Sequence, residues 1–212
     1  MKIKMICMTC IIIAAMIISG CAQRLKANIN AYTSKTESSQ IVPGSKIAVV
    51  ENDKAANPLL EEEVKIKIGK ILEKKGYSVV PIEKADYLLF YGYGMGGPRS
   101  IDITVPKVGV GYFASSSGTK IYSLTTGTGH RQATMHDRWL LINVVDAKQL
   151  KGKDKPKAVW VGDTTSSGTS SDMRTVINYL LATTFEYFGQ DSGKEVTTII
   201  QKDDARAKEL EL

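Results

Sequence analysis

The hydrophobic positions of this chain fall into one unbroken apolar run, several short segments with the spacing of strands and two segments with the spacing of helices. Residues 6–18 are apolar and carry no charge. Residues Asp86–Tyr93 are apolar on both alternating faces, which predicts a central strand covered on both sides. Between Ile101 and Thr128, glycines and serines interrupt an alternating pattern, which predicts two or three strands joined by turns. The other predicted strands are Lys46–Val50, Tyr77–Ile82, Arg138–Ala147 and Lys157–Asp163.

Two segments have the apolar spacing of helices. In residues 57–76, Asn57 can cap the N-terminus, Pro58 suits the first helical position and Gly76 ends the helix. The second helix opens at Ser171 or Asp172 and ends at Gly189. The first helix presents one apolar face, made of Leu60, Val64, Ile68, Ile71 and Leu72.

The order of these elements predicts an α+β fold. One strand, a helix and two strands are followed by a run of strands and a second helix. We therefore expect a mixed, largely antiparallel sheet with two main helices packed on one face. Residues 46–189 are predicted to form this single domain. Residues 21–45 are polar and are predicted to be a tether, and residues 190–212 a charged C-terminal tail.

Residues 1–20 have the three zones of an export signal: Lys2 and Lys4, the apolar run, and small residues before Cys21. A transmembrane helix is the alternative, but a helix that crosses a membrane needs about 20 apolar residues, and the apolar run at residues 6–18 is shorter. The sequence Ile18-Ser19-Gly20-Cys21 resembles a lipobox, in which the Cys21 thiol is acylated after cleavage. This predicts a lipoprotein that is held in a membrane by acyl chains on Cys21. Ala22 follows, without the aspartate of inner-membrane retention, so we expect an outer-membrane anchor facing the periplasm in a Gram-negative host.

Composition narrows the chemistry of the mature chain. Cys7 and Cys10 form a C-x-x-C within the signal, so cleavage leaves Cys21 as the single cysteine. A disulfide, a thiol catalyst and a cysteine metal site are thereby excluded. Loss of Lys2 and Lys4 lowers the formal charge from +6 to +4. This charge forms no basic stripe with interleaved aromatics, so we expect no nucleic-acid partner.

Several motifs invite a functional interpretation, and each has a structural alternative. Gly92–Gly97 satisfies G-x-G-x-x-G after a strand, but turn and strand residues follow it, where a dinucleotide site needs a helix. We therefore predict a structural role and no cofactor. His130 and His136 are the only histidines, and even spacing on a strand would put both on one face. A metal or proton-transfer site and polar loop positions remain the alternatives for them.

No nucleophile is paired with a base in the sequence, so we expect no enzyme and assign no catalytic, cofactor-binding or metal residues. A lysine cluster at residues 148–157 could touch lipid headgroups or an acidic partner, or be a solvated loop. Core packing is expected to explain the strand aromatics Tyr87, Phe90, Tyr91, Tyr93, Trp139 and Trp160.

Several pieces together resemble an uncharacterised family of bacterial envelope lipoproteins, domain of unknown function 4136. The most specific are Ala85–Leu89 (ADYLL), Ile142–Ala147 (INVVDA) and Val159–Gly162 (VWVG), with Gly76-Tyr77 and the helix at 172–188. This resemblance spans residues 45–190 and implies a lipoprotein without an assigned activity. A fainter resemblance links the strand–helix–strand opening to auxiliary lipoproteins of ABC-type lipid or solute export.

We therefore expect a lipid-anchored envelope protein with a non-catalytic binding or assembly role in the periplasm and an envelope protein as partner. The alternative is an auxiliary subunit of an ABC-type export system that contacts a small apolar ligand. Such a subunit should have an apolar pocket at a sheet end.

Overall fold

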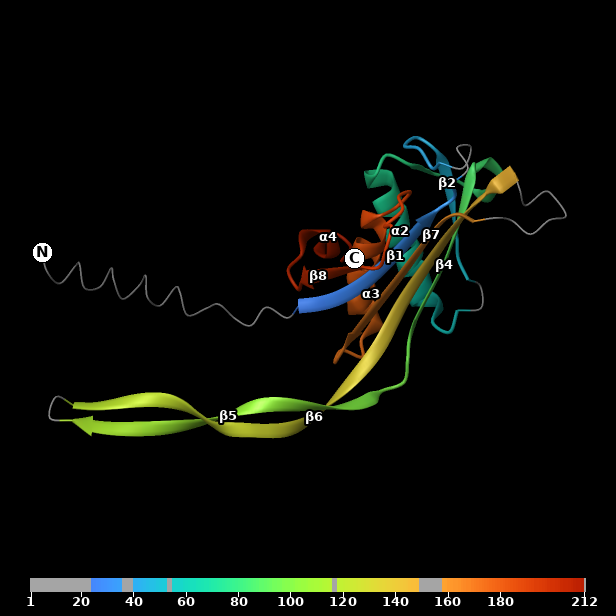
Figure 1. Cartoon of the computed structure of the whole chain (residues 1–212). Helices are drawn as coiled ribbons and strands as arrows, with labels where there is room; N and C mark the ends of the chain where they lie inside the picture. Colours follow the sequence, from blue (N-terminus) through green and yellow to red (C-terminus); the bar gives the residue numbers. More distant parts are fainter. Residues whose placement is uncertain (1–23, 36–39, 53–54, 116–117, 149–157, 212) are drawn as a thin grey trace, which may run out of the picture.

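The computed structural model describes residues 24–35, 40–52, 55–115, 118–148 and 158–211 (Figure 1). A mixed sheet of eight strands is its centre, in the order β3-β2-β4-β6-β7-β1-β8, and β5 pairs with β6. The elements are β1 (Arg24–Thr33), β2 (Lys46–Val50), α2 (Pro58–Lys74), β3 (Ser78–Val79), η3 (Ile82–Lys84), β4 (Tyr87–Met95), β5 (Arg99–Ser115), β6 (Gly118–Asp146), β7 (Ala158–Gly168), α3 (Met173–Glu186), β8 (Val196–Gln201) and α4 (Ala205–Lys208).

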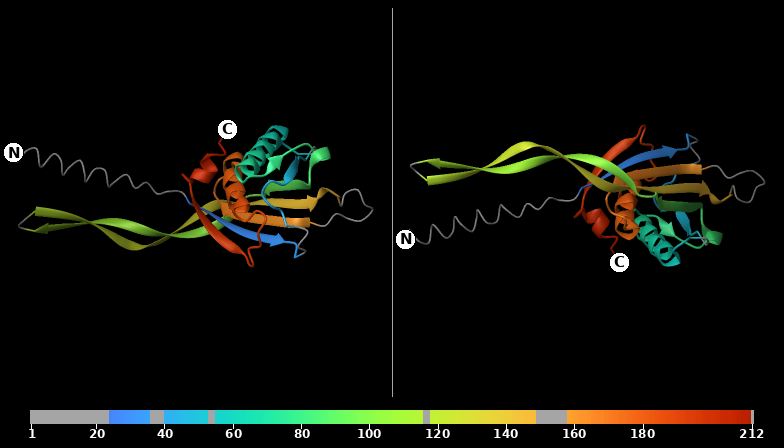
Figure 2. Two further views of the ribbon diagram at one scale, coloured as in Figure 1. Left: turned by 90° about the horizontal axis from the view of Figure 1, so that it is seen from above. Right: turned by 90° about the horizontal axis from the view of Figure 1, so that it is seen from below.

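The sheet is largely antiparallel, and its helices lie on one side. Strand β2 runs parallel to β3 and β4, while the remaining pairs are antiparallel. Helices α2 and α3 pack on the same face, and α4 lies beside α3 (Figure 2). The predicted α+β class is thereby confirmed. None of the helices in the described part of the chain is long and apolar enough to cross a membrane.

Both main helices end where their sequence signals indicate. The Asn57 side chain accepts a hydrogen bond from the Leu60 amide at 3.1 Å, and Pro58 is the first residue of α2. Gly76, at φ +85°, follows this helix in the left-handed region that glycine favours. Asp172 caps α3, and Gly189 adopts φ +77° shortly after its end.

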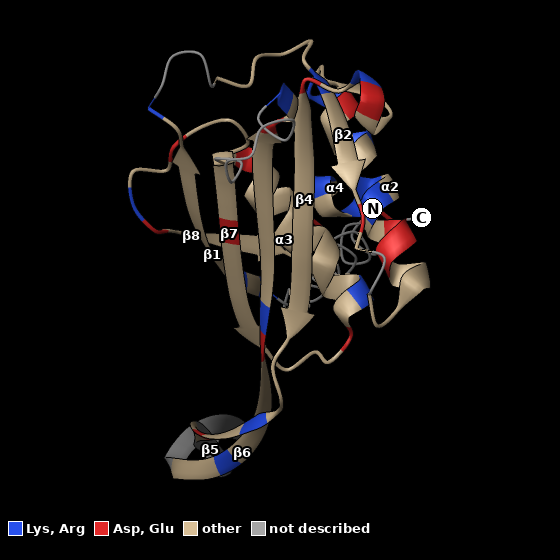
Figure 3. Ribbon diagram, turned by 90° about the vertical axis from the view of Figure 1, so that its right-hand side faces the viewer, with Lys and Arg blue, Asp and Glu red and all other residues tan. Residues whose placement is uncertain are grey.

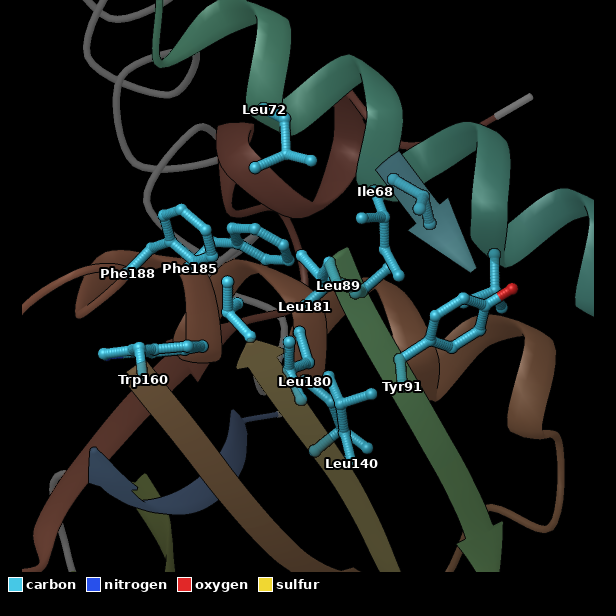
Figure 4. Close-up of a cluster of buried hydrophobic side chains, with 14 of the residues drawn as sticks. Ile68, Leu72, Leu89, Tyr91, Leu140, Trp160, Leu180, Leu181, Phe185 and Phe188 are labelled. Carbon is cyan, nitrogen blue, oxygen red and sulfur yellow. The ribbon is translucent and has the colours of Figure 1, made fainter. Parts of the chain in front are cut away.

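The core fills the space between the helices and the sheet (Figure 4). The aromatic rings of Trp160 on β7 and Phe188 after α3 lie 4.9 Å apart, and Phe185 stacks on Phe188 at 5.1 Å. Leu180 and Leu140 are fully buried on the facing surfaces of α3 and β6. Contact between side chains from distant segments therefore joins the two layers.

A buried charge lies between the two helices. Lys67 on α2 is 1 % exposed, and its Nζ donates to Glu63 Oε1 at 2.6 Å and Asn178 Oδ1 at 2.7 Å. Glu63 also pairs with Arg174 of α3 at 3.1 Å. Because a buried ammonium is tolerated only with partners, this network ties α2 to α3 through Asn178 and Arg174.

The predicted tether and the predicted tail are wrong in extent. Residues 24–33, expected to be a tether, form β1 between β7 and β8, with Ala27, Ile29 and Ala31 fully buried. Residues 196–208, expected to be a charged tail, form β8 and α4, and Ile200 is fully buried. Both segments belong to the domain because they complete one edge of the sheet.

Between residues 101 and 128, two strands are confirmed, with Ser115 paired to Gly118 where the hairpin closes, but the turns predicted at the other glycines are wrong. Strands β5 and β6 form one long hairpin that projects from the body as a two-stranded arm (Figures 1 and 2). The glycines at 109, 111, 127 and 129 lie within paired strands, and the register shifts once, between Lys107 and Val108. The predicted strand Arg138–Ala147 is the continuation of β6 into the central sheet.

Candidate interaction surface

The sheet face opposite the helices is open, as Figure 3 shows, with the helices behind the strands. A cross-strand row on it runs from Phe90 on β4 through Asn143 and Val161 to Tyr32 on β1. Tyr32 is 57 % exposed and Phe90 is 36 % exposed. We call the outward side chains of β4, β6, β7 and β1 the open face. The prediction that residues 86–93 are covered on both sides is thus wrong for Phe90.

Trp139 is the largest side chain of the open face, and two glycines make room for it. A Cβ at Gly94 would stand 2.7 Å from the Trp139 ring, and one at Gly92 would stand 3.5 Å from it. The ring remains 43 % exposed. The glycines of G-x-G-x-x-G therefore allow a close approach, and β5 rather than a helix follows them. Core packing, predicted for all strand aromatics, holds for Tyr91 and Trp160 but not for Trp139.

A carboxylate lies near the centre of this face. Asp163 on β7 stands between Leu141 of β6 and Asn30 of β1. Burial raises the pKa of the Asp163 carboxyl, and the charge of Glu195 raises it further. The open face thus combines exposed aromatic rings with a partly desolvated acid, a mixture that can bind polar and apolar groups together.

A cluster of polar contacts holds the base of the arm. Arg99 of β5 donates to the Asp137 carboxylate of β6 through Nε at 2.9 Å and Nη2 at 3.1 Å. The Ser167 hydroxyl of β7 donates to the same carboxylate, and the Gly96 amide to the Asp137 carbonyl at 2.7 Å. The Arg99 and Ser167 hydrogen bonds lower the Asp137 pKa. One residue thereby links β5, β6 and β7 where the arm begins.

The two histidines do not form a joint site. His130 is exposed on the arm opposite Thr104, and His136 is half-buried at its base opposite Gly168. Six residues of strand separate them by about 20 Å, whereas ligands of one metal lie within a few ångströms of it. Among the described residues, no three His, Cys, Asp or Glu side chains gather as a metal site requires.

Two other predicted features fall largely outside the described residues. Cys21 lies there, three residues before β1 begins. Of the lysine cluster only Lys148 is described, and it is exposed, with its amide bonded to the Asp146 carboxylate at 2.8 Å.

An apolar cavity lies in the helix layer rather than at a sheet end. It has a volume of about 420 Å³ between α2, α3 and α4. Ile71, Phe185 and Leu210 line its apolar part, and lysines of α2 stand at its rim. Burial lowers the pKa of Lys75 there, and the nearby Glu186 opposes this shift. Sequence reasoning missed this cavity because α4 was not expected.

Comparisons with known proteins found similar solved structures at low sequence identity. No protein-family model and no curated protein matches the sequence. The PelC dodecamer of Paraburkholderia phytofirmans is 13 % identical, with a TM-score of 0.42, 78 % of this chain covered and 99 % of that chain. A DUF4136 family protein of Bacteroides thetaiotaomicron is 14 % identical, with a TM-score of 0.40 and coverage of 74 % and 93 %.

A PDZ domain protein of Parabacteroides distasonis is 15 % identical, with a TM-score of 0.42. It covers 88 % of this chain, which spans 41 % of that longer protein. Solved structures similar to this chain thus include a DUF4136 family protein, and the similarity concerns the fold alone.

Proposed function

We propose that this chain is a lipid-anchored envelope protein with a non-catalytic binding or assembly role in the periplasm. The export signal and the lipobox at Cys21 support the anchor. Cys21 precedes Arg24, the first residue of β1, by three residues, and three residues span at most about 11 Å. An acylated Cys21 would therefore hold the body of the protein against the membrane surface.

The observation that carries the binding role is the projecting arm. None of residues 99–104 and 128–137 is buried, and β5 pairs with β6 alone. A two-stranded ribbon without a packed face is marginally stable in water, so contact with a partner would stabilise it. The open face adjoins the arm at Trp139, so a partner bound to the arm would also meet the exposed side chains of Trp139 and Phe90.

Membership of the DUF4136 family belongs to the same proposal. The pieces that carry the resemblance lie on neighbouring strands: Leu88 of β4 pairs with Val145 of β6, and Val144 of β6 pairs with Trp160 of β7. Sequence pieces that pair on adjacent strands are more specific together than each is alone. The family supplies no activity to carry over.

Labelled palmitate tests the anchor in growing cells. Cys21→Ala should abolish incorporation, because its thiol is the acylated atom. Cys10→Ala is the matched control and should be labelled like the parent, since Cys10 lies in the signal core. Equal labelling of Cys21→Ala and the parent would refute the anchor. Recovery with inner-membrane markers on a sucrose gradient would refute the outer-membrane location.

Photo-crosslinking in intact cells tests the partner surface. Benzoylphenylalanine at Arg131 on the arm or Phe90 on the open face should give one discrete crosslinked species. The same probe at the exposed Glu83 of η3, which belongs to neither the arm nor the open face, should give none. A ladder common to all three positions would count against a specific surface.

A shortened arm then tests assembly. Residues 101–133 are replaced by Asn-Gly, which joins the paired Ser100 and Thr134 through a tight turn and keeps the Arg99–Asp137 contact. The body should fold as before while the discrete crosslink at Phe90 is weakened or lost. An unchanged crosslink and full complementation would show that the arm is dispensable.

The cavity of the helix layer favours a second candidate, an auxiliary subunit of an export system that holds a small apolar ligand. Its floor is apolar, and its rim includes Lys70 and Lys74. Native mass spectrometry of the protein extracted from membranes should then detect a co-purified amphiphile. Ala182→Phe, which narrows the cavity, should remove that species.

A further inference from the structure

A polar cavity lies at the end of the body from which the arm departs. It has a volume of about 460 Å³ and lies where the start of β1, the β7–α3 loop and α3 meet. Three cations line it: Arg24 from β1, Arg138 from β6 and Lys202 after β8. Its other walls include Thr169 and Tyr179. We call this cavity the arginine pocket.

Arg138 is buried there without a counter-ion. It is 3 % exposed, and its guanidinium lies over Gly168, where a Cβ would stand 2.3 Å from Nη2. Nη1 donates a long hydrogen bond of 3.4 Å to the Ser170 carbonyl. In the described structure its Nε has no partner, and neither has the Ser166 hydroxyl oxygen opposite it on β7. A guanidinium stays charged at any physiological pH, so a buried one that lacks an anion favours binding of an anion.

Three of the acids nearby are already engaged, and two others, Asp203 and Glu211, whose charges act on Tyr179, do not line the pocket. Asp137 is held by Arg99 and Ser167, as described above. Asp172 caps α3 and accepts from the Thr175 hydroxyl at 2.5 Å, and Asp204 pairs with Arg206. Within the described residues, neither Arg24 nor Lys202 forms an ion pair. The net charge of the pocket lining is therefore positive.

We propose that the arginine pocket binds the phosphate group of a phosphate ester, with Arg138 as its buried anchor. The oxygens of a phosphate group accept paired hydrogen bonds from a guanidinium, and Arg24 and Lys202 balance the remaining charge. Ser166 stands opposite Arg138 on β7, outside the residues that line the pocket, and its unpaired buried hydroxyl is a further donor toward a bound phosphate. The cavity is many times larger than the roughly 30 Å³ of a water molecule, so the organic part of an ester also fits.

Two sources share this chemistry: a phospholipid headgroup and a soluble phosphate ester. The headgroup source rests on the proposed lipid anchor, because Arg24 follows Cys21 by three residues and the anchor would keep the pocket at headgroup level. The soluble source does not depend on that anchor. The experiment therefore has one arm for each.

The first arm is a calorimetric titration of the full chain in detergent with sn-glycerol 3-phosphate, with glycerol as the control. Arg138→Gln should weaken saturable binding at least tenfold, and Ser166→Ala and Lys202→Gln several-fold. Lys208→Gln removes an exposed cation of α4 outside the pocket and should bind like the parent.

The second arm measures the unfolding temperature of the chain in vesicles. Phosphatidylglycerol is compared with glucuronosyl diacylglycerol, which is anionic but carries no phosphate. A rise in phosphatidylglycerol alone, lost in Arg138→Gln, would assign the lipid headgroup. Binding of glycerol phosphate without this rise would assign a soluble ester.

Should Arg138→Gln fail to fold, Ser166→Ala and Lys202→Gln decide the matter. The proposal is overturned if the titration shows no saturable binding and phosphatidylglycerol gives no selective rise in the unfolding temperature. It is also overturned if Ser166→Ala and Lys202→Gln both bind as Lys208→Gln does. Palmitate labelling of Cys21→Ala is read separately. Loss of the anchor hypothesis would thus leave a positive titration with glycerol phosphate intact.

Discussion

Trp139 lies across β4 only because Gly94 has no side chain. Gly94→Val should place methyl groups where the Trp139 ring lies and displace it from the sheet. We expect a loss of about 1–2 kcal/mol in the free energy of unfolding, measured with urea, since overpacking costs this order. Gly97→Val is the matched control, because nothing lies within 4 Å of a Cβ there and its φ is not positive. Equal losses in both variants would contradict the close-approach explanation.

The buried ammonium of Lys67 depends on its hydrogen-bond partners Glu63 and Asn178. Lys67→Met should lower the free energy of unfolding by about 1–3 kcal/mol, because Asn178 Oδ1 loses its donor and Glu63 keeps only Arg174 as a partner. Adding Asn178→Leu should restore part of the loss, since it removes one of the unsatisfied groups. Lys70→Met, on the exposed side of α2, should change little. A double variant as unstable as the single one would argue against the network.

At the scale of elements, the cap of α3 ties stability to pH. Hydrogen bonds from the Thr175 hydroxyl and the Arg174 amide lower the Asp172 pKa in the folded protein. A lowered folded pKa means that this stabilisation is present above the unfolded value of about 3.9 and is lost as pH falls through the folded value. Asp172→Ala should cost about 1 kcal/mol at pH 7.

The pH dependence distinguishes the cap from a packing effect. The difference in unfolding free energy between Asp172→Ala and the parent should shrink as pH falls below 4. Asp172→Asn retains an amide oxygen as acceptor and should lose less at pH 7 while lacking this pH dependence. A difference that stays constant from pH 7 to pH 3 would mean that the carboxylate charge contributes nothing.

At the scale of the whole molecule, the protein is a packed body with a projecting arm and an open face. If it acts by presenting these surfaces, the two histidines are dispensable. The double variant His130→Ala, His136→Ala should leave the unfolding free energy within about 0.5 kcal/mol and complement a deletion strain, with protein levels measured in parallel. A folded, abundant variant that fails to complement would mean that these side chains act chemically.

A substitution in the buried face of α3 tests the packing of the whole body. Leu180 is fully buried between α3 and the sheet. Leu180→Asp should be severely destabilising, by several kcal/mol, because the carboxylate has no partner there. Glu186→Asp, at the exposed end of the same helix, serves as the control. Cooperative unfolding near the parent's urea midpoint in Leu180→Asp would contradict this view of the core.

The sequence alone determined the features that depend on neighbouring residues. Helix limits were readable at Asn57 and Gly76 because caps and left-handed glycines act within one turn. The α+β class and the central strands followed from apolar runs that must be buried. A structural need for glycine was predicted for Gly92–Gly97, and the close approach of the Trp139 ring explains it at Gly92 and Gly94 but not at Gly97.

Only the tertiary structure decided which segments join the sheet and which surface stays open. In β1 the alternating apolar positions include the small side chains of Ala27 and Ala31, so the signal was present but weak, and its partners lie on β7 and β8. The arm depends on pairing between residues 99–115 and 118–146, which the glycines concealed. The arginine pocket combines β1, β6 and the segment after β8. Strand pairing and pockets are non-local, so their physical cause is contact between distant residues rather than local pattern.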